Sequence, residues 1–176
     1  MIKKLILGLL ALLIIGVGTL FIINGEDKYE ADKYNLTATN GLEKGSKIDF
    51  TLPDQFNKPH SLKSDTQILI LTFSKNSGHI VKNYLGKQEK DFLDKHKAMF
   101  IADISPMPVV IRNTFALPDL KKSPFAVLLI YDKELAKKVK PKESSDKIVV
   151  VYLKNKSITD IKYISNEDEL KEIFKK

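Results

Sequence analysis

A serine and a histidine lie two residues apart directly after an apolar stretch, and they are the first groups in the chain that could do chemistry. The stretch, QILILTF, is followed at residues 74–79 by the sequence SKNSGH. A hydroxyl beside an imidazole is the pairing of a nucleophile with its general base. Ser77 and His79 are therefore a candidate catalytic pair, and Asp103 or Ser105 could approach them from the end of a neighbouring strand.

The spacing of Ser77 and His79 argues against this pairing. Residues two apart at the start of a helix point to different sides, so a direct hydrogen bond between them is not expected. The alternative is structural, with Ser77 or Asn76 as the helix cap. Gly78 would then allow close packing, and His79 would be partly exposed. We favour this interpretation and assign no catalytic residue, but an enzyme that uses His79 or Asp103 as a general base stays open as the alternative.

The rest of the chain offers no pattern for a metal or a cofactor. His60, His79 and His96 fall in three separate segments, and no pair has the i, i+4 spacing of a helical ligand set. The sequence contains neither a G-x-G-x-x-G turn nor a P-loop. The absence of cysteine excludes disulfides, thiolate zinc sites, thiol nucleophiles and thiol-linked lipids. We therefore expect no metal and no small-molecule cofactor.

The charge of the chain does not favour nucleic acid as a partner. The net charge is +7, but almost every cation is a lysine, and Arg112 is the single arginine. Arginine is the side chain suited to bidentate recognition of phosphate. A lysine-rich surface without it is better explained as a solvated surface, and we expect no nucleic-acid binding.

The N-terminus predicts a membrane anchor. Lys3 and Lys4 precede an uncharged apolar run from Leu5 to Ile23, which as a helix would span roughly 28 Å, close to the thickness of a bilayer core. Positive charges stay on the cytoplasmic side. We therefore expect a single pass through the inner (cytoplasmic) membrane, with the C-terminal domain on the periplasmic side.

A cleaved signal peptide is the competing interpretation of this run. The nearest candidate cleavage site is Gly16-Val17-Gly18, and cutting there would leave an apolar N-terminus, TLFII. We favour an uncleaved anchor. The expected organisation is an anchor at residues 1–24, a polar tether at 25–44 and one domain at 45–176.

The hydrophobic pattern of the domain predicts an α/β fold. Near-continuous apolar runs are typical of strands buried in an α/β sheet, and helical spacing follows the first of them at residues 80–85. A short helix is expected at 109–117, ending before Pro118, and a capped helix at Asn166 with Glu169 three residues on. The order implies three layers around a mixed central sheet, with an antiparallel hairpin at one edge. Strands are expected at 47–52, 67–73, 98–104, 123–132, 148–153 and 158–164.

Several of these segments resemble one family. The sequence GSKIDFTLPDQFNKPHSL is similar to the opening of thioredoxin-like proteins of the peroxiredoxin and thiol-disulfide oxidoreductase type. ILILTFSKNSGHIVKNYL resembles the core strand, active-site turn and first long helix of that family, and SPFAVLLIYD resembles the strand that starts at its cis-proline. The resemblance covers residues 45–176 and implies a thioredoxin-like domain, preceded by the transmembrane helix.

The departure from the family decides the chemistry. Its redox members hold a cysteine at the helix N-terminus after the core strand, where Ser77 or Asn76 stands in this chain. A hydroxyl cannot form a disulfide or reduce a peroxide, so thiol-disulfide and thiol-peroxidase activity are excluded. We expect a non-redox binding or assembly module in the cell envelope.

The resemblance also implies a binding surface. In the family, a cis-proline loop lies beside the active-site turn and presents backbone groups to extended peptide. Ser123 and Pro124 would occupy that loop, and Asn76, Ser77, Gly78 and His79 would form the turn. A protein or an extended peptide would be the partner. A plain trans proline at a strand start remains the alternative for Pro124.

Overall fold

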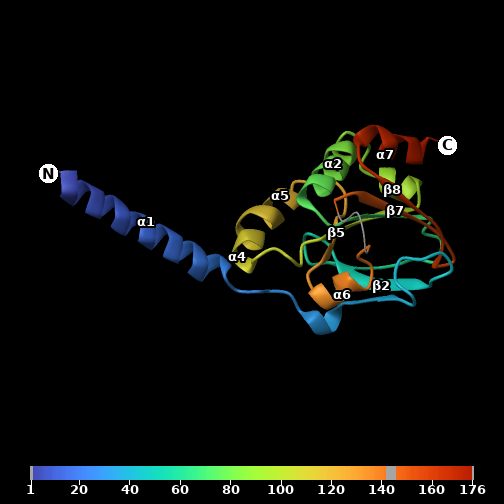
Figure 1. Cartoon of the computed structure of the whole chain (residues 1–176), viewed down its shortest axis with the longest axis horizontal. Helices are drawn as coiled ribbons and strands as arrows, with labels where there is room; N and C mark the ends of the chain where they lie inside the picture. The colour runs from blue at the N-terminus through green and yellow to red at the C-terminus, as the bar shows by residue number, and fades with distance from the viewer. Residues whose placement is uncertain (1, 142–145, 176) are drawn as a thin grey trace.

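The chain begins with one long helix that projects from the body of the molecule (Figure 1). The computed structural model describes residues 2–141 and 146–175. The helix, α1 (Ile2–Asn24), contains a window from Ile2 to Thr19 with a mean hydropathy of 2.1, none of it buried. By length and composition, α1 could cross a membrane or serve as a signal sequence.

A mixed five-stranded sheet forms the centre of the domain, as the sequence predicted. Its strand order is β6-β5-β4-β7-β8. The first three strands are parallel to one another, whereas β7 runs antiparallel to β4 and forms the expected hairpin with β8. The strands are β4 (Ile68–Thr72), β5 (Ala98–Asp103), β6 (Leu128–Ile130), β7 (Ile148–Lys154) and β8 (Ser157–Ile164).

Helices cover one face of this sheet. The longest of them, α2 (Lys75–Gly86), and the C-terminal α7 (Glu167–Phe174) lie in one layer with the short α3 (Phe92–Lys95) (Figure 1). Their apolar side chains share a core cluster with Ile70 of β4. Helix α7 starts as predicted: the side chain of Asn166 accepts the Glu169 N–H at 2.9 Å, and the Glu169 carboxylate accepts the Ser165 N–H at 2.7 Å.

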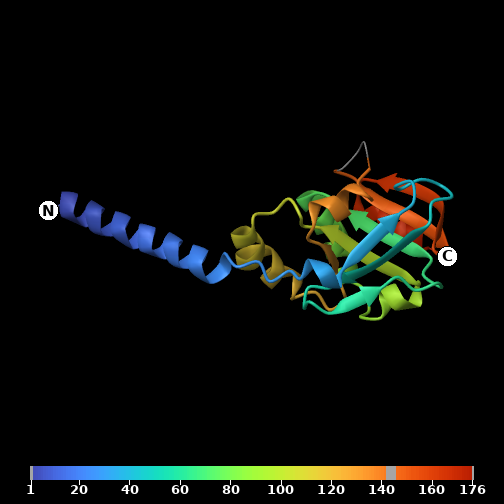
Figure 2. The same ribbon diagram turned by 90° about the horizontal axis from the view of Figure 1, so that it is seen from below.

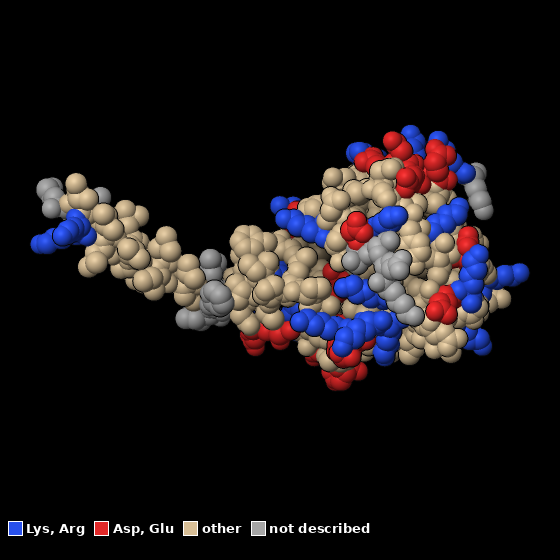
Figure 3. All heavy atoms as spheres, in the orientation of Figure 1, with Lys and Arg blue, Asp and Glu red and all other residues tan. Residues whose placement is uncertain are grey.

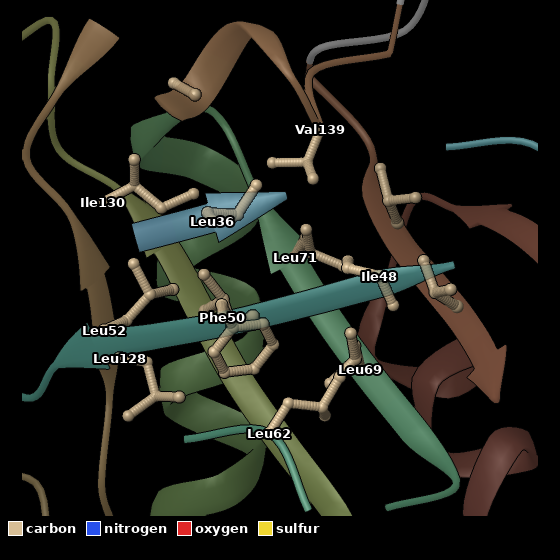
Figure 4. Packing of buried hydrophobic residues seen from close by; sticks show 14 of the residues in the cluster. Leu36, Ile48, Phe50, Leu52, Leu62, Leu69, Leu71, Leu128, Ile130 and Val139 are labelled. Carbon is tan, nitrogen blue, oxygen red and sulfur yellow. The ribbon is translucent and has the colours of Figure 1, made fainter. Parts of the chain in front are cut away.

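A small antiparallel sheet covers the other face. It consists of β1 (Asn35–Ala38), β2 (Ile48–Pro53) and β3 (Pro59–Ser61), with α6 (Lys133–Lys137) beside it. Figure 2 shows these strands in front of the central sheet. Phe50 and Leu36 point toward Leu69 and Leu71 of β4 in a dry core (Figure 4). The third layer is therefore a second sheet.

Part of the expected tether belongs to this layer. Within residues 25–44 lie a 3₁₀ turn, η1 (Ala31–Lys33), and strand β1, whose Leu36 is completely buried. Strand β1, before the expected domain start at residue 45, therefore contributes to the core. A single buried leucine between two exposed polar residues gives too little periodicity to reveal a strand in the sequence.

A continuous helical segment links β5 to β6. It comprises α4 (Val109–Ile111), the π-helical η2 (Arg112–Ala116) and α5 (Leu117–Leu120). The expectation that this helix ends before Pro118 is wrong. Pro118 falls in the first turn of α5, directly after the π-helical turn, and at such a position its missing N–H is tolerated.

This segment holds the end of α1 against the domain. The guanidinium of Arg112 donates to Asp27 at 2.6 Å and lies 4.7 Å from the ring centre of Tyr131. The amide of Asn113 donates to the carbonyls of Asn24 and Glu26, each at 2.9 Å. We call residues 24–27 with Arg112 and Asn113 the anchor clamp. Arg112 is 3% exposed, so it is not available to bind phosphate.

Candidate functional site

Two serines at the N-terminus of α2 bind each other, and one of them caps the helix. Ser74, in extended conformation, is the helix cap, and its hydroxyl accepts the Ser77 N–H at 3.2 Å. The Ser77 hydroxyl lies 2.9 Å from that of Ser74, donates to the Ser74 carbonyl at 3.1 Å and is completely buried. The cap is thus Ser74 rather than Ser77 or Asn76. The hydroxyl at the expected cysteine position is occupied by local hydrogen bonds.

Two other residues of the turn face solvent. Asn76 and His79 are exposed, and Gly78 is half-buried. A methyl group added at Gly78 would lie 3.7 Å from the Thr72 hydroxyl, an ordinary contact. Packing therefore leaves room for a side chain at this glycine, and the turn presents Asn76 and His79 outward from a rigid base.

The geometry does not bring His79 and Asp103 together as an acid-base pair. The Asp103 carboxylate is buried and accepts the Ser105 N–H at 2.9 Å. Within residues 2–141 and 146–175, no hydrogen bond or salt bridge to the His79 ring is formed. The alternative of a general base at His79 or Asp103 thus gains no support from the structure.

A different carboxylate faces this side of α2. Lys82, one turn beyond His79, donates to Asp119 of α5. The hydrogen bond from Lys82 is the main cause of a lowered pKa at Asp119, and the positive charges of Lys82, Lys122 and His79 act in the same direction. His79 thus lies near Asp119, on a surface where cations outnumber the single carboxylate.

Ser123 and Pro124 lie apart from the turn. They precede β6 at the edge of the sheet, and β5 separates that strand from β4. Phe125 lines a hollow with Lys97 and Ala98, which lie at the start of β5 and therefore at the opposite end of the sheet from Ser77. All peptide bonds of the described residues are trans, including that before Pro124. The expected contact between the two segments is not formed.

The start of β7 takes the place expected for the proline segment. Ile148 pairs with Thr72, so the end of β4 and the beginning of β7 lie side by side. Asp146 and Lys147, directly before Ile148, therefore lie beside the turn that follows β4. Sequence reasoning missed them because an apolar run introduced by proline was the stronger signal. The antiparallel hairpin of β7 and β8 was the signal that could have found them.

The electrostatics of the turn are mostly positive. The first turn of α2 contains no acidic residue, and its free backbone N–H groups carry the positive end of the helix dipole. Lys75 and Lys147 add cations, with Asp146 as the nearby anion. Such a surface can donate hydrogen bonds to carbonyl or carboxylate groups of a partner.

Two hollows of the domain lie away from the turn. One includes Ile68 and Leu153, and the other includes Ala98 and Phe125. Because Ile68 and Ala98 begin β4 and β5, both hollows are at the far end of the sheet from Ser77. The exposed Asn76 and His79 are accessible to a macromolecule at this end of the sheet.

Comparison with known proteins relates the chain to others through its fold. No protein-family model and no curated protein matches the sequence. Solved structures do match: a candidate protein disulfide isomerase from Bacteroides thetaiotaomicron (19% identity, TM-score 0.49, 79% of this chain and 89% of that chain) is one. The thioredoxin domain of a thiol-disulfide oxidoreductase from Bacteroides vulgatus is another (13%, 0.48, 76% and 99%). A third is a SCO1/SenC family lipoprotein from Bacillus anthracis (15%, 0.43, 77% and 95%).

The chain has an α/β fold with a mixed five-stranded sheet, and the solved structures that it matches include thioredoxin-like proteins. The observed order agrees with the predicted one: a core strand, a turn, a long helix, a parallel strand, and later an antiparallel hairpin followed by a helix. Identities below 20% in the three structures concern the fold alone. The sequence contains no cysteine, so this chain cannot carry out thiol chemistry by itself.

Proposed function

We propose that this protein is a membrane-anchored, thioredoxin-like module that binds or assembles other proteins without redox chemistry. The observation that carries the proposal is the serine-capped turn. Ser77 is completely buried and its hydroxyl is engaged by Ser74. Asn76 and His79, on either side of it, remain exposed. At the position that would be reactive in a redox relative, the side chain is buried and hydrogen-bonded. The neighbouring side chains of Asn76 and His79 are exposed to solvent.

A protein or an extended peptide is the partner that this surface suits. The N–H groups at the start of α2 and the Lys75 cation favour groups that accept hydrogen bonds, such as backbone carbonyls and carboxylates. The start of β7 extends the surface through Asp146 and Lys147. The binding surface we propose therefore comprises Asn76, Gly78, His79, Asp146 and Lys147, with the buried Ser77 beneath it.

The proposed location is the cell envelope. In this proposal α1 stays uncleaved in the inner membrane, with Lys3 and Lys4 on the cytoplasmic side and the domain on the periplasmic side. The mass of the mature protein tests this directly, because cleavage near residues 16–18 would remove most of α1. Retention of residue 2 in the mature chain is the expected result.

The binding surface is tested by crosslinking in intact cells. A photoreactive amino acid at position 76 or 79 should capture a defined protein, whereas the same group at Lys171, exposed on α7, should not. A double variant with Asn76→Ala and His79→Ala, probed from position 75, should capture less of that protein. Equal capture from positions 79 and 171, or unchanged capture by the double variant, would contradict the proposal.

A further inference from the structure

The helical segment between β5 and β6 has an uncharged outer surface. Residues 105–118, SPMPVVIRNTFALP, contain one charged residue, Arg112, and it is buried in the anchor clamp. On the outside, Ile111 is 47% exposed and Phe115 is 62% exposed. Four residues apart in one helical segment, they lie on the same side. Two large apolar side chains thus face outward with no exposed charge between them.

This surface lies beside the C-terminal end of α1, where the apolar run of the helix ends. The segment contacts α1 through both α4 and η2. The Asn113 amide donates to the carbonyls of Asn24, the last residue of α1, and of Glu26 just beyond it. Figure 3 shows an uncharged surface beside the end of α1 that joins the body. If α1 spans a membrane, residue 24 marks the membrane surface, and the clamp holds Phe115 at the same height.

We infer that α4 and η2 form a second, interfacial membrane contact, in which Ile111 and Phe115 insert among the lipids of the membrane that α1 spans. This inference depends on the anchoring part of the proposed function. Amphipathic helices that lie in an interface bury their apolar face about 5–10 Å into the boundary between headgroups and acyl chains. Lys121 and Lys122, exposed directly after α5, can contact anionic headgroups from the rim.

The lipid surface suits this face better than a protein groove does. The apolar side chains belong to a segment that is hydrogen-bonded to the end of a candidate span, so the membrane is the nearest apolar phase. Phenylalanine is among the residues typical of the apolar face of interfacial helices. Phe56, another exposed aromatic at 51%, lies at the turn between β2 and β3 and serves as a control.

The chain contains no tryptophan, so one introduced tryptophan is a clean reporter. The full-length protein would be reconstituted in vesicles of phosphatidylethanolamine and phosphatidylglycerol, with bromine atoms on the acyl chains near the headgroup or near the methyl end. Three variants are compared: Leu10→Trp in α1, Phe115→Trp, and Phe56→Trp. Emission from position 115 should be blue-shifted and quenched more strongly by the shallow bromines than by the deep ones. Position 56 should show neither effect.

The three positions distinguish a failure of the interfacial contact from a failure of the membrane anchor. Quenching at position 10 together with emission at 115 that matches position 56 would overturn the interfacial contact and leave the anchor intact. No quenching at either 10 or 115 would overturn the anchor and this inference together. A blue shift at 115 without quenching would also overturn the inference, because it would mean that a second copy or another protein covers Phe115. In an Ile111→Ser background, quenching at 115 should decrease.

Discussion

Ser74 and Ser77 show how two hydroxyl groups can satisfy the polar groups at the start of a helix. The backbone N–H of Ser77 donates to the Ser74 hydroxyl. The two hydroxyls also bind each other. The side chains of the turn therefore stabilise the start of α2 and leave no free nucleophile at Ser77.

The cap predicts a measurable stability effect. Ser74→Ala removes the acceptor for the Ser77 N–H and should lower the free energy of unfolding by about 1 kcal/mol. Ser74→Asn keeps a side-chain oxygen at the same position and should stay near the original value. Urea titration of the full-length protein in detergent solution measures both variants. Equal midpoints for the alanine variant and the parent would show that the cap is not formed.

Tyr131 lies in an aromatic stack beside the anchor clamp. Its ring is 4.9 Å from that of Tyr29, which is 5.7 Å from that of Tyr34. Burial raises the pKa of Tyr131 to about 12, with the Arg112 guanidinium acting in the opposite direction. The neutral phenol is therefore the form that the folded protein holds.

This shift predicts a loss of stability at alkaline pH. The pKa of Tyr131 is raised from about 10 in the unfolded chain to about 12. Its contribution is complete below pH 10 and declines as the pH rises to 12, where the loss is on the order of 2–3 kcal/mol. Tyr131→Phe should lose less stability over that range than the parent. Equal alkaline losses in both proteins, measured by urea titration at each pH, would contradict the shift.

At the scale of elements, the segment from α4 to α5 connects the anchor to the domain. Its buried side contains Arg112 and Asn113, which bind the chain just after α1. The π-helical turn at residues 112–116 lies within this contact region. Single π-helical turns of this kind are frequent at functional sites of helices.

Removal of the Asn113 amide should open the anchor clamp. Asn113→Ala loses two hydrogen bonds to backbone carbonyls, each worth about 1 kcal/mol. The open population of residues 24–30 should rise about tenfold or more, since each 1.4 kcal/mol is a factor of ten. Hydrogen exchange of these amides, or trypsin cleavage after Lys28, measures the change. Asn83→Ala, at an exposed position of α2, is the control and should leave the rates of exchange and cleavage in residues 24–30 unchanged.

The sequence predicted the elements whose patterns are local and strong. The apolar runs of β4, β5 and β7, the hairpin and the capped start of α7 needed only periodicity and capping residues. The strand after Pro124 was also found, but the position of Pro124 away from the turn was not. The choice between a parallel edge next to β5 and an antiparallel place next to β4 depends on the whole chain path, which no local pattern records.

The candidate site was predicted in part for the same reason. The turn at residues 74–79 lies where the strand and helix patterns meet, so sequence located it. The observed cap is Ser74 and not the expected Ser77 or Asn76, because the helix begins several residues before its first apolar side chains. Asp146 and Lys147 reach the turn only through the pairing of Ile148 with Thr72, a contact between distant parts of the chain.

At the scale of the whole molecule, the fold uses residues on both sides of the expected boundary at 45. Leu36 of β1 packs with Phe50 and Leu71 in the core between the two sheets (Figure 4). Leu36→Ala should therefore lower the free energy of unfolding by about 2–5 kcal/mol. Thr37→Ala, one residue further and exposed, should change it by less than about 0.5 kcal/mol. If residues 25–44 were a free tether, urea titration would give the two variants equal stability.

In the proposed function, the anchor clamp would also limit how far the domain can move from the membrane to meet a partner. A free chain of the length of residues 25–44 would let a domain move roughly 25 Å from its anchor point. Here Asp27 is bound to Arg112, and the carbonyls of Asn24 and Glu26 are bound to Asn113. Residues 24–27 therefore cannot move freely relative to the domain, and the domain stays close to the end of α1. In a membrane, rotation of α1 would then be rotation of the whole domain. Encounters would be set by diffusion of both molecules in the plane, and a partner would meet the turn at one height and one orientation.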